Sequence, residues 1–544
     1  AQDFVNNIQC KINAQEGNTL PVSAFTEYVD GTTPSGTAAY EKRGIAVNVP
    51  VWQPENCIQC NRCAYVCPHA AIRPVALTEE EAANAPEGMA TLPMTGMKDY
   101  KFTMTVSAYD CTGCGSCANV CPGKKGAKAL AMENMEANAG LQKFFDYGRE
   151  LPIKEDVIAK FKETTVKGSQ FKQPLLEFSG ACAGCGETPY AKLITQLFGD
   201  RMYIANATGC SSIWGNSSPS TPYTTNAKGQ GPAWANSLFE DNAEFGYGML
   251  LAQRAIRDGL KAKVEAVVAE GKDEAVKEAG QEWLDTFSVG ATNGAATDKL
   301  IAALEACGCD AAKEILTQKD YLSKKSQWIF GGDGWAYDIG FGGVDHVLAS
   351  GRDINVMVFD TEVYSNTGGQ SSKSTPTGAI AQFAAGGKET KKKDMASIAM
   401  SYGYVYVAQI SMGADFNQTV KAIAEAEAYP GPSLIIAYAP CINHGIKKGM
   451  SKAQTEEELA VKCGYWHNFR FNPAAENKFS LDSKTPDMEN YMDFLNGEVR
   501  YNSLQRQNPE KAARLFAKNE SEAQARYEYL QKLITLYGAD KKED

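Results

Sequence analysis

Four short apolar runs, each closed by glycine or small polar residues, stand out in the chain after residue 170. They are Met202–Ala205, Gln327–Phe330, Ile354–Phe359 and Ser433–Tyr438. Continuous apolar runs of this length are typical of strands that are buried on both faces of a parallel sheet. The pattern therefore predicts several parallel strands in this part of the chain.

Helical patterns such as Asn417–Glu427 lie between these runs. Strands that alternate with helices predict an α/β fold with a doubly wound, mostly parallel sheet, which we assign to residues 165–500. Residues 251–326 are charged and helix-rich and are expected to form a helical insertion. Residues 501–544, rich in Lys, Glu and Ala, predict a C-terminal helical tail that either wraps a neighbouring surface or frays.

The first part of the chain has a different character. Residues 1–45 are rich in Gly, Thr, Ser and Pro around Asp30–Gly36 and have little apolar periodicity, so we interpret them as a linker segment. Residues 46–150 contain two copies of one cysteine pattern, and an internal repeat of this kind predicts a small α+β domain.

Composition narrows the class of protein. A net charge of -11 over 544 residues argues against a nucleic-acid groove, which needs a basic face. There is no apolar run of eighteen residues and no signal-like start at Ala1–Phe4, so we expect a cytoplasmic protein without a membrane span. Because the first residue is not Met, the chain can equally be a fragment, a subunit or a processed product.

The cysteine repeat matches the bacterial ferredoxin pattern in both copies, each ending in Cys-Pro. The eight cysteines are Cys57, Cys60, Cys63, Cys67, Cys111, Cys114, Cys117 and Cys121. In two-cluster ferredoxins the fourth cysteine of each run binds the other cluster. We therefore predict two 4Fe-4S clusters, one held by Cys57, Cys60, Cys63 and Cys121, the other by Cys111, Cys114, Cys117 and Cys67.

Four further cysteines suggest a third cluster. Cys182 and Cys185 form a single Cys-x-x-Cys before Gly186-Glu187, while Cys210 and Cys441 each lie just past the end of a predicted strand. The carboxyl ends of strands are where open α/β sheets build their sites, so these four thiolates can converge on a 4Fe-4S cluster. The remaining cysteines, Cys10, Cys307, Cys309 and Cys463, are interpreted as structural residues without partners.

A glycine-rich turn follows the strand Gln327–Phe330. It reads Gly331-Gly332-Asp333-Gly334-Trp335 and places a carboxylate among glycines whose N–H groups can approach phosphate oxygens. The next strand is followed by Thr361 and Val363, which can supply a hydroxyl and a backbone carbonyl. Oxygen donors of this kind suit Mg²⁺, so the pattern indicates a site for a diphosphate with magnesium.

Taken together and in this order, these motifs resemble those of the pyruvate:ferredoxin (flavodoxin) oxidoreductases. The resemblance also rests on Ala207–Ser211 and Tyr364–Gln370, covers nearly all of residues 46–500, and points to the C-terminal half of such enzymes. It implies thiamine diphosphate as the cofactor, with Asp333, Thr361 and Val363 holding Mg²⁺. The chain departs from the family in having Thr361 where many relatives have Asn, which still leaves an oxygen ligand.

The resemblance further implies which residues bind the cofactor or lie beside the substrate. These are Glu187, Cys210, Gly332, Gly334, Trp335 and Asn366, with Glu187 and Asn366 as candidate catalytic residues. The implied reaction is oxidative decarboxylation of pyruvate to acetyl-CoA and CO₂, of the pyruvate synthase type, with electrons passing through three 4Fe-4S clusters to ferredoxin or flavodoxin. Implied partners are coenzyme A, the N-terminal domains of the same enzyme, fused or separate, and a second copy in a homodimer.

Two alternatives stay open from the residues alone. One is an oxidoreductase for another 2-oxoacid, because the pocket for the substrate side chain is not readable here. The other is an electron-transfer iron-sulfur subunit without thiamine diphosphate.

Overall fold

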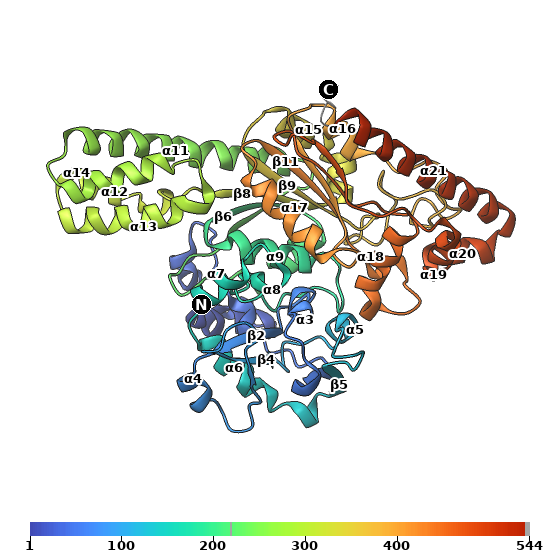
Figure 1. The fold of residues 1–544 in the computed structure, drawn as a ribbon, viewed down its shortest axis with the longest axis horizontal. Helices are drawn as coiled ribbons and strands as arrows, with labels where there is room; N and C mark the ends of the chain where they lie inside the picture. Colours follow the sequence, from blue (N-terminus) through green and yellow to red (C-terminus); the bar gives the residue numbers. More distant parts are fainter. Residues whose placement is uncertain (218–219, 539–544) are drawn as a thin grey trace, which may run out of the picture.

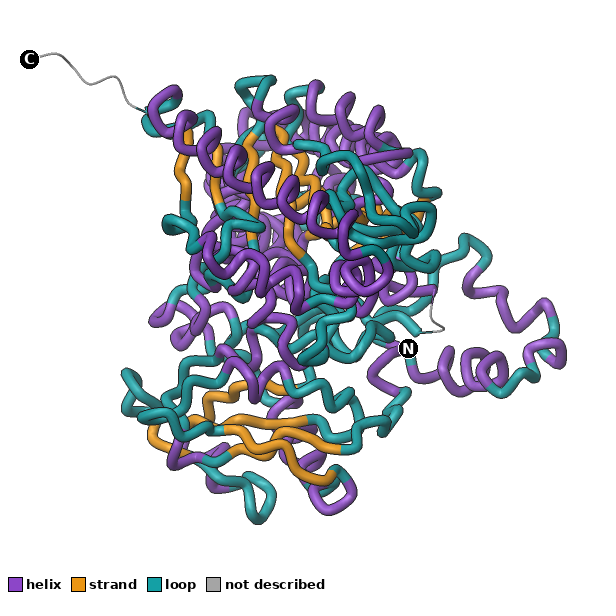
Figure 2. The backbone as a smooth tube through the Cα atoms, turned by 90° about the vertical axis from the view of Figure 1, so that its right-hand side faces the viewer, coloured by secondary structure: helices purple, strands orange, loops and turns teal. Residues whose placement is uncertain are grey.

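The structure, a computed structural model, describes residues 1–217 and 220–538. A large α/β unit occupies the centre, a smaller unit with the cysteine repeat lies below it, and a helical arm projects to one side (Figure 1). Seen from a second direction, the two groups of strands remain clearly separated (Figure 2). Residues 539–544, which belong to the predicted tail, lie outside the described residues.

The central sheet has eight strands within the described residues, in the order β13-β12-β10-β11-β9-β8-β6-β7. The strands from β10 to β7 run parallel, and β12 and β13 are antiparallel at one edge. Their bounds are β6 Met202–Ala207, β7 Ala233–Ser237, β8 Ser326–Gly332, β9 Ile354–Asp360, β10 Tyr406–Ile410, β11 Pro432–Tyr438, β12 Phe469–Phe471 and β13 Phe479–Leu481. The predicted α/β class is confirmed.

The four apolar runs predicted as strands lie in β6, β8, β9 and β11. All residues of β9 and β11 are buried, because helices cover both faces of the sheet. Helices α9 (Thr188–Phe198) and α17 (Phe416–Ala428) pack on one face. Helices α15 (Phe341–Ala349), α16 (Met395–Met400) and α21 (Pro509–Leu536) pack on the other, which gives a doubly wound sheet.

The arm consists of α11 (Asn242–Glu270), α12 (Glu274–Asp285), α13 (Gly290–Cys307) and α14 (Asp310–Leu316). It has its own apolar core around Trp283, Leu260 and Leu300, separate from the cores on the sheet. This core explains how the arm can extend away from the body (Figure 1).

The smaller unit is built on two short sheets. Strands β1 (Asn48–Trp52) and β5 (Leu130–Asn134) pair with each other, and β2 (Ile72–Leu77), β4 (Lys101–Val106) and β3 (Leu92–Pro93) form the second sheet. The short helices α3 (Arg62–Tyr65) and α5 (Ser116–Val120) each carry one cysteine of the repeat. The other helices here are α4 (Glu79–Ala83), α6 (Leu141–Glu150), α7 (Glu155–Phe161) and α8 (Val166–Ser169).

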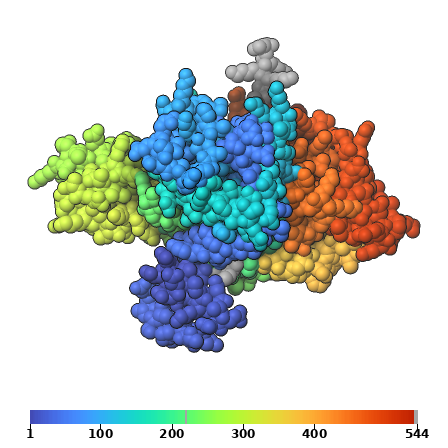
Figure 3. Space-filling view, turned by 90° about the horizontal axis from the view of Figure 1, so that it is seen from below, coloured from blue at the N-terminus to red at the C-terminus, as the bar shows by residue number. Residues whose placement is uncertain are grey.

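The two ends of the chain pack differently. The N-terminal residues, including α1 (Gln2–Phe4) and α2 (Cys10–Asn13), form a lobe that stands off the body (Figure 3). After α18 (Ala453–Lys462), the helices α19 (Tyr491–Gly497), α20 (Val499–Gln507) and α21 bury residues such as Leu515 and Leu530 against the sheet unit. Within the described residues, every helix is too short or too polar to serve as a membrane span.

Candidate functional site

The carboxyl ends of four neighbouring strands bring together most of the predicted site residues. In the sheet order β11-β9-β8-β6, the strands are followed by Cys441, Thr361, Asp333 and Cys210, respectively, at or close to their last residues. Parallel strands end at the same edge, so residues far apart in the sequence meet there.

Three oxygen donors converge between β8 and β9. The Thr361 hydroxyl donates to Asp333 Oδ1 over 3.0 Å, and the same hydroxyl lies 3.1 Å from the backbone oxygen of Val363. The Ser372 hydroxyl donates to Asp333 Oδ2 over 2.6 Å. Asp333, Thr361 and Val363, the three predicted ligands of Mg²⁺, are thus mutual neighbours.

Two buried carboxyl groups, those of Asp333 and Asp360, interact electrostatically at this site. Asp333 and Asp360 are both fully buried. Burial, and then the neighbouring charge of Asp360, raise the pKa of Asp333 well above its usual value. A divalent cation with a preference for oxygen would relieve this repulsion, so the donor set fits Mg²⁺.

The glycines of the turn after β8 have different roles. A Cβ at Gly331 would lie 2.3 Å from the Trp335 ring, and one at Gly334 would lie 2.4 Å from the Tyr364 ring. Both glycines are therefore required for close ring packing. A Cβ at Gly332 would meet only a backbone oxygen at 3.9 Å, so this position is open. The buried Trp335 Nε1 finds no hydrogen-bond partner among the described residues.

The segment with Cys182 and Cys185 is attached to the end of β11. Gly186 donates its N–H to the Pro440 oxygen over 3.2 Å, and a Cβ at Gly186 would lie 2.6 Å from the Pro440 nitrogen. Only glycine allows this approach, which holds the Cys-x-x-Cys next to Cys441.

Glu187, the first residue after that glycine, is fully enclosed. Its Oε2 accepts a hydrogen bond from Trp214 Nε1 over 2.7 Å. Burial raises the pKa of Glu187 to about 7, although the Trp214 bond acts in the opposite direction. A carboxyl group with this pKa can hold or release a proton near neutral pH.

The third thiol set, as we call it, consists of Cys182, Cys185, Cys210 and Cys441. Burial raises the pKa of Cys441 to about 11, and Glu187 and Cys182 add to the rise. Cys210 Sγ lies 3.1 Å from Ser365 Oγ, and its pKa is raised by burial, by Glu187, and by two other members of the set, Cys185 and Cys441. The four thiols therefore lie within electrostatic reach of one another, beside Glu187.

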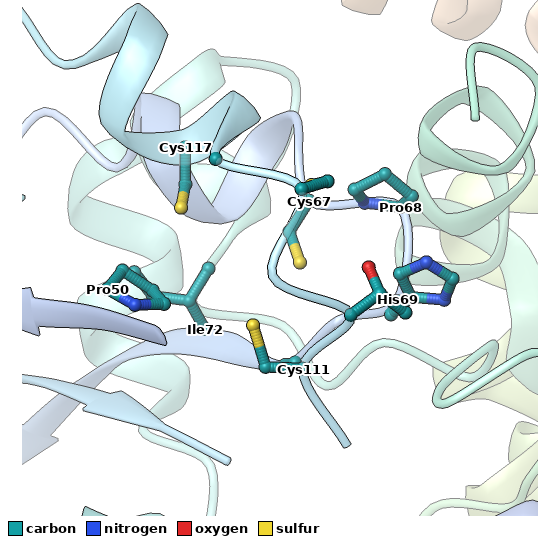
Figure 4. Close-up of a pocket in the computed structure, with 11 residues that line it drawn as sticks. Pro50, Cys67, Pro68, His69, Ile72, Cys111 and Cys117 are labelled. Atoms are coloured by element: carbon teal, nitrogen blue, oxygen red, sulfur yellow. The ribbon is translucent and has the colours of Figure 1, made fainter. Parts of the chain in front are cut away.

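The repeat cysteines separate into two sets. The first thiol set, Cys57, Cys60, Cys63 and Cys121, lines one cavity, and the second, Cys67, Cys111, Cys114 and Cys117, lines another. The side chains of Cys67, Cys111 and Cys117 point into a common space, beside which His69 lies (Figure 4). The fourth cysteine of each run thus lies with the first three of the other run.

The second and third thiol sets are adjacent. Burial raises the pKa of Cys114, and the backbone N–H groups of Ser116 and Gly184 oppose that rise. Gly184 lies between Cys182 and Cys185, so the two sets are close to each other. Across residues 1–217 and 220–538, no three His, Cys, Asp or Glu side chains are close enough to hold a single metal ion.

Several important residues lie outside the predicted set. Glu362, between Thr361 and Val363, has a φ of 60° and is fully buried. Its carboxylate accepts from Lys392 Nζ over 3.0 Å and pairs with Arg500 over 2.8 Å. Burial alone would raise the pKa of Glu362, but the charges of Lys392 and Arg500 lower it to about 2.

Other predicted residues have less defined surroundings. Asn366 is exposed in the loop that closes through the Tyr364 N–H to the Gln370 oxygen over 2.9 Å. Its assignment as a catalytic residue stays a prediction. The prediction that Cys307 and Cys309 lack partners is wrong, because their Sγ atoms lie 2.9 Å apart.

Comparison with family models identifies three segments. Residues 56–125 match a 4Fe-4S dicluster domain, and residues 290–437 match the C-terminal TPP binding domain of thiamine pyrophosphate enzymes. Residues 1–46 match EKR, a domain of unknown function.

Three curated relatives match the chain closely. They are a pyruvate-flavodoxin oxidoreductase of Enterobacter agglomerans (58% identical), one of Klebsiella pneumoniae (56%) and a pyruvate:ferredoxin oxidoreductase of Moorella thermoacetica (56%). Each alignment covers 98% of this chain, but only 45–46% of the relative. The chain, which carries a 4Fe-4S dicluster domain and a TPP binding domain, is therefore homologous over nearly its whole length to the pyruvate:ferredoxin and pyruvate-flavodoxin oxidoreductases, of which it spans about half.

Proposed function

We propose that this chain is the iron-sulfur and thiamine-diphosphate part of an enzyme that oxidatively decarboxylates pyruvate to acetyl-CoA and CO₂. One observation carries the proposal: the oxygen donors Asp333, Thr361 and Val363 share one sheet edge with the third thiol set. A cofactor held by the former would lie beside an electron acceptor held by the latter.

Different residues of this site are proposed to bind magnesium, to contact thiamine diphosphate and to lie beside the reacting atoms. Asp333, Thr361 and Val363 hold Mg²⁺, and Gly332 and the free Trp335 N–H are available to the bound thiamine diphosphate. Glu187 and Asn366 are the candidate residues beside the reacting atoms. When bound, the cofactor supplies an electron sink for the decarboxylation of a 2-oxoacid.

Three 4Fe-4S clusters, one for each thiol set, supply one-electron transfer between this site and an external ferredoxin or flavodoxin. The influence of the Gly184 N–H on the pKa of Cys114 supports proximity of the third and second sets. The second and first sets share one unit, because each contains the fourth cysteine of the other run.

The same proposal covers the partners of the chain, its location and its domain division. The proposed partners include the remaining domains of the enzyme, because the chain spans only 45–46% of its relatives, and a second copy in a homodimer. Within this proposal twelve of the sixteen cysteines bind clusters instead of forming disulfides, which is typical of proteins in a reducing compartment such as the cytoplasm. We retain the domain division at residues 1–45, 46–150, 165–500 and 501–544.

The test is a stoichiometry measurement on the complete, anaerobically purified enzyme that contains this chain. We expect about twelve irons per chain, from three four-iron clusters, and about one thiamine diphosphate. About eight irons without thiamine diphosphate would instead support an electron-transfer subunit. Release of CO₂ from pyruvate, 2-oxobutyrate and 2-oxoglutarate would then be compared. Faster turnover of either of the other two acids would refute the pyruvate assignment.

A further inference from the structure

The helical arm carries a pair of cysteines that belongs to none of the three thiol sets. Cys307 is the last residue of α13, and Cys309 directly precedes α14. The junction of these helices lies at the outer end of the arm (Figure 1). The pair is therefore remote from the sheet edge that carries the candidate cofactor site.

The local backbone brings the two thiols together. Gly308 has a φ of +60°, a left-handed conformation that glycine adopts without strain, and it ends α13. The resulting turn places Cys307 Sγ 2.9 Å from Cys309 Sγ. Only a small movement separates this arrangement from the bond length of about 2.05 Å in a disulfide.

The pair is accessible to reagents. Cys309 is exposed and Cys307 is partly exposed, unlike the buried Cys463. Cys10 is also exposed, and it provides a comparison within the same chain. Exposed thiols in close pairs exchange readily with external disulfides, whereas buried single thiols do not.

The two thiols differ in acidity. The hydrogen bond from Cys307, and then the backbone N–H of Ala312, lower the pKa of Cys309. The same hydrogen bond raises the pKa of Cys307. Cys309 is thus the thiol that ionises first and attacks first.

We propose that Cys307 and Cys309 form a redox-active dithiol, a modification site that low-molecular-weight disulfides oxidise to an intramolecular disulfide. The Cys309 thiolate attacks one sulfur of the oxidant, here glutathione disulfide, and releases one glutathione thiolate. Cys307 then loses its proton and attacks the Cys309 sulfur, which forms the Cys307–Cys309 bond and releases the second glutathione. The protein loses two electrons and two protons, and one glutathione disulfide becomes two glutathione thiols. This inference does not depend on the proposed function.

The experiment uses the intact enzyme under anaerobic conditions in mixtures of reduced and oxidised glutathione. Free thiols are alkylated, and the tryptic peptide of residues 300–313, which contains both cysteines, is weighed. The reduced peptide should carry two alkyl groups. The oxidised peptide should carry none and should be about 2 Da lighter than the reduced peptide before alkylation, because a disulfide lacks two hydrogens. Cys10 in the same sample should carry either an alkyl group or one glutathione, since it has no neighbouring thiol to displace glutathione.

Single variants separate the two roles. Cys307→Ser should accumulate glutathione on Cys309, and Cys309→Ser should accumulate less on Cys307 in the same time. Two alkyl groups at every glutathione ratio, or a peptide with two glutathione adducts and no internal disulfide, would overturn the proposal. Equal rates in the two variants would overturn the assignment of Cys309 as the attacking thiol.

Discussion

Replacing Arg500 with Met tests whether the buried ion pairs position the loop that carries Thr361 and Val363. Arg500, on α20, is 4% exposed; its guanidinium pairs with Glu362 over 2.8 Å and with Glu498 over 2.7 Å. The substitution keeps an apolar stem of similar length but removes the charge. Two buried carboxylates then lose a partner, although Lys392 still pairs with Glu362 over 3.0 Å.

The expected magnitude has two parts. Removing one partner of a buried ion pair costs about 3–5 kcal/mol of unfolding free energy, and we expect the lower end because Lys392 remains. A left-handed backbone costs a residue with a side chain about 1–2 kcal/mol, so Glu362 can relax from its φ of 60° once Arg500 is gone. Bound magnesium and thiamine diphosphate must restore that conformation, which weakens their binding about 5- to 30-fold.

The assay is a calorimetric titration of cofactor-free enzyme with thiamine diphosphate in the presence of magnesium. Arg506→Met is the matched control, because Arg506 lies on the same helix and is exposed. Arg500→Lys keeps the charge and should recover part of the affinity. If Arg500→Met lowers the stability but leaves the affinity within twofold of the control, the ion pair does not position the loop.

Three further predictions concern other residues. Asp333→Asn should weaken binding of magnesium with thiamine diphosphate about 10- to 100-fold. It should not lower the melting temperature of the cofactor-free enzyme, because it also removes the repulsion between Asp333 and Asp360. Calorimetry measures the affinity and thermal melts measure the melting temperature; an unchanged affinity would exclude Asp333 as a ligand. Cys441→Ser should reduce the iron content from about twelve to about eight per chain, whereas unaltered iron would exclude Cys441 from a third cluster. Burial, and then Arg526, lower the pKa of His467 to about 3, so the unfolded chain takes up a proton below pH 6.5 that the folded chain does not. The free energy of unfolding therefore falls as the pH drops below 6.5, and His467 accounts for about 2 kcal/mol of this loss at pH 5. His467→Phe should remove that loss in denaturant titrations at pH 7.5 and pH 5. An identical loss in the variant would show that His467 does not cause it.

The core of the fold could be predicted because its strands have a strong signal. β9 and β11 are buried along their whole length, and such strands are apolar at every position. The edge strand β7 has the sequence Ala-Trp-Ala-Asn-Ser and is partly exposed, so its pattern resembles that of a loop. The antiparallel strands β12 and β13 were missed because each has only three residues, too few to show a periodic pattern.

The candidate site was predictable where it depends on strand ends and not where it depends on distant contacts. Asp333, Thr361, Cys210 and Cys441 follow strands, and parallel strands bring their ends together. Glu362 had no such signal, since a charged side chain in a loop ordinarily faces solvent. Its partner Arg500 comes from the last helices, and no sequence pattern links the two.

The pairing of Cys307 with Cys309 was missed although the two are almost adjacent. In a helix, the side chains of residues two positions apart do not face each other. The left-handed turn at Gly308 reverses that direction, and glycine just after a helical segment was the available signal.

The interleaving of the thiol sets has a consequence for the order in which the protein matures. The first two sets lie entirely within residues 57–121, so both are complete once this part of the chain has left the ribosome. The third thiol set is incomplete until Cys441 has been synthesised, which occurs about 10–50 s after Cys210 at ordinary rates of translation. During that interval Cys182, Cys185 and Cys210 stand without their fourth member. Iron delivered to the nascent chain would therefore fill the two ferredoxin-type positions first, and a prematurely terminated product would contain those clusters but not the one beside the cofactor.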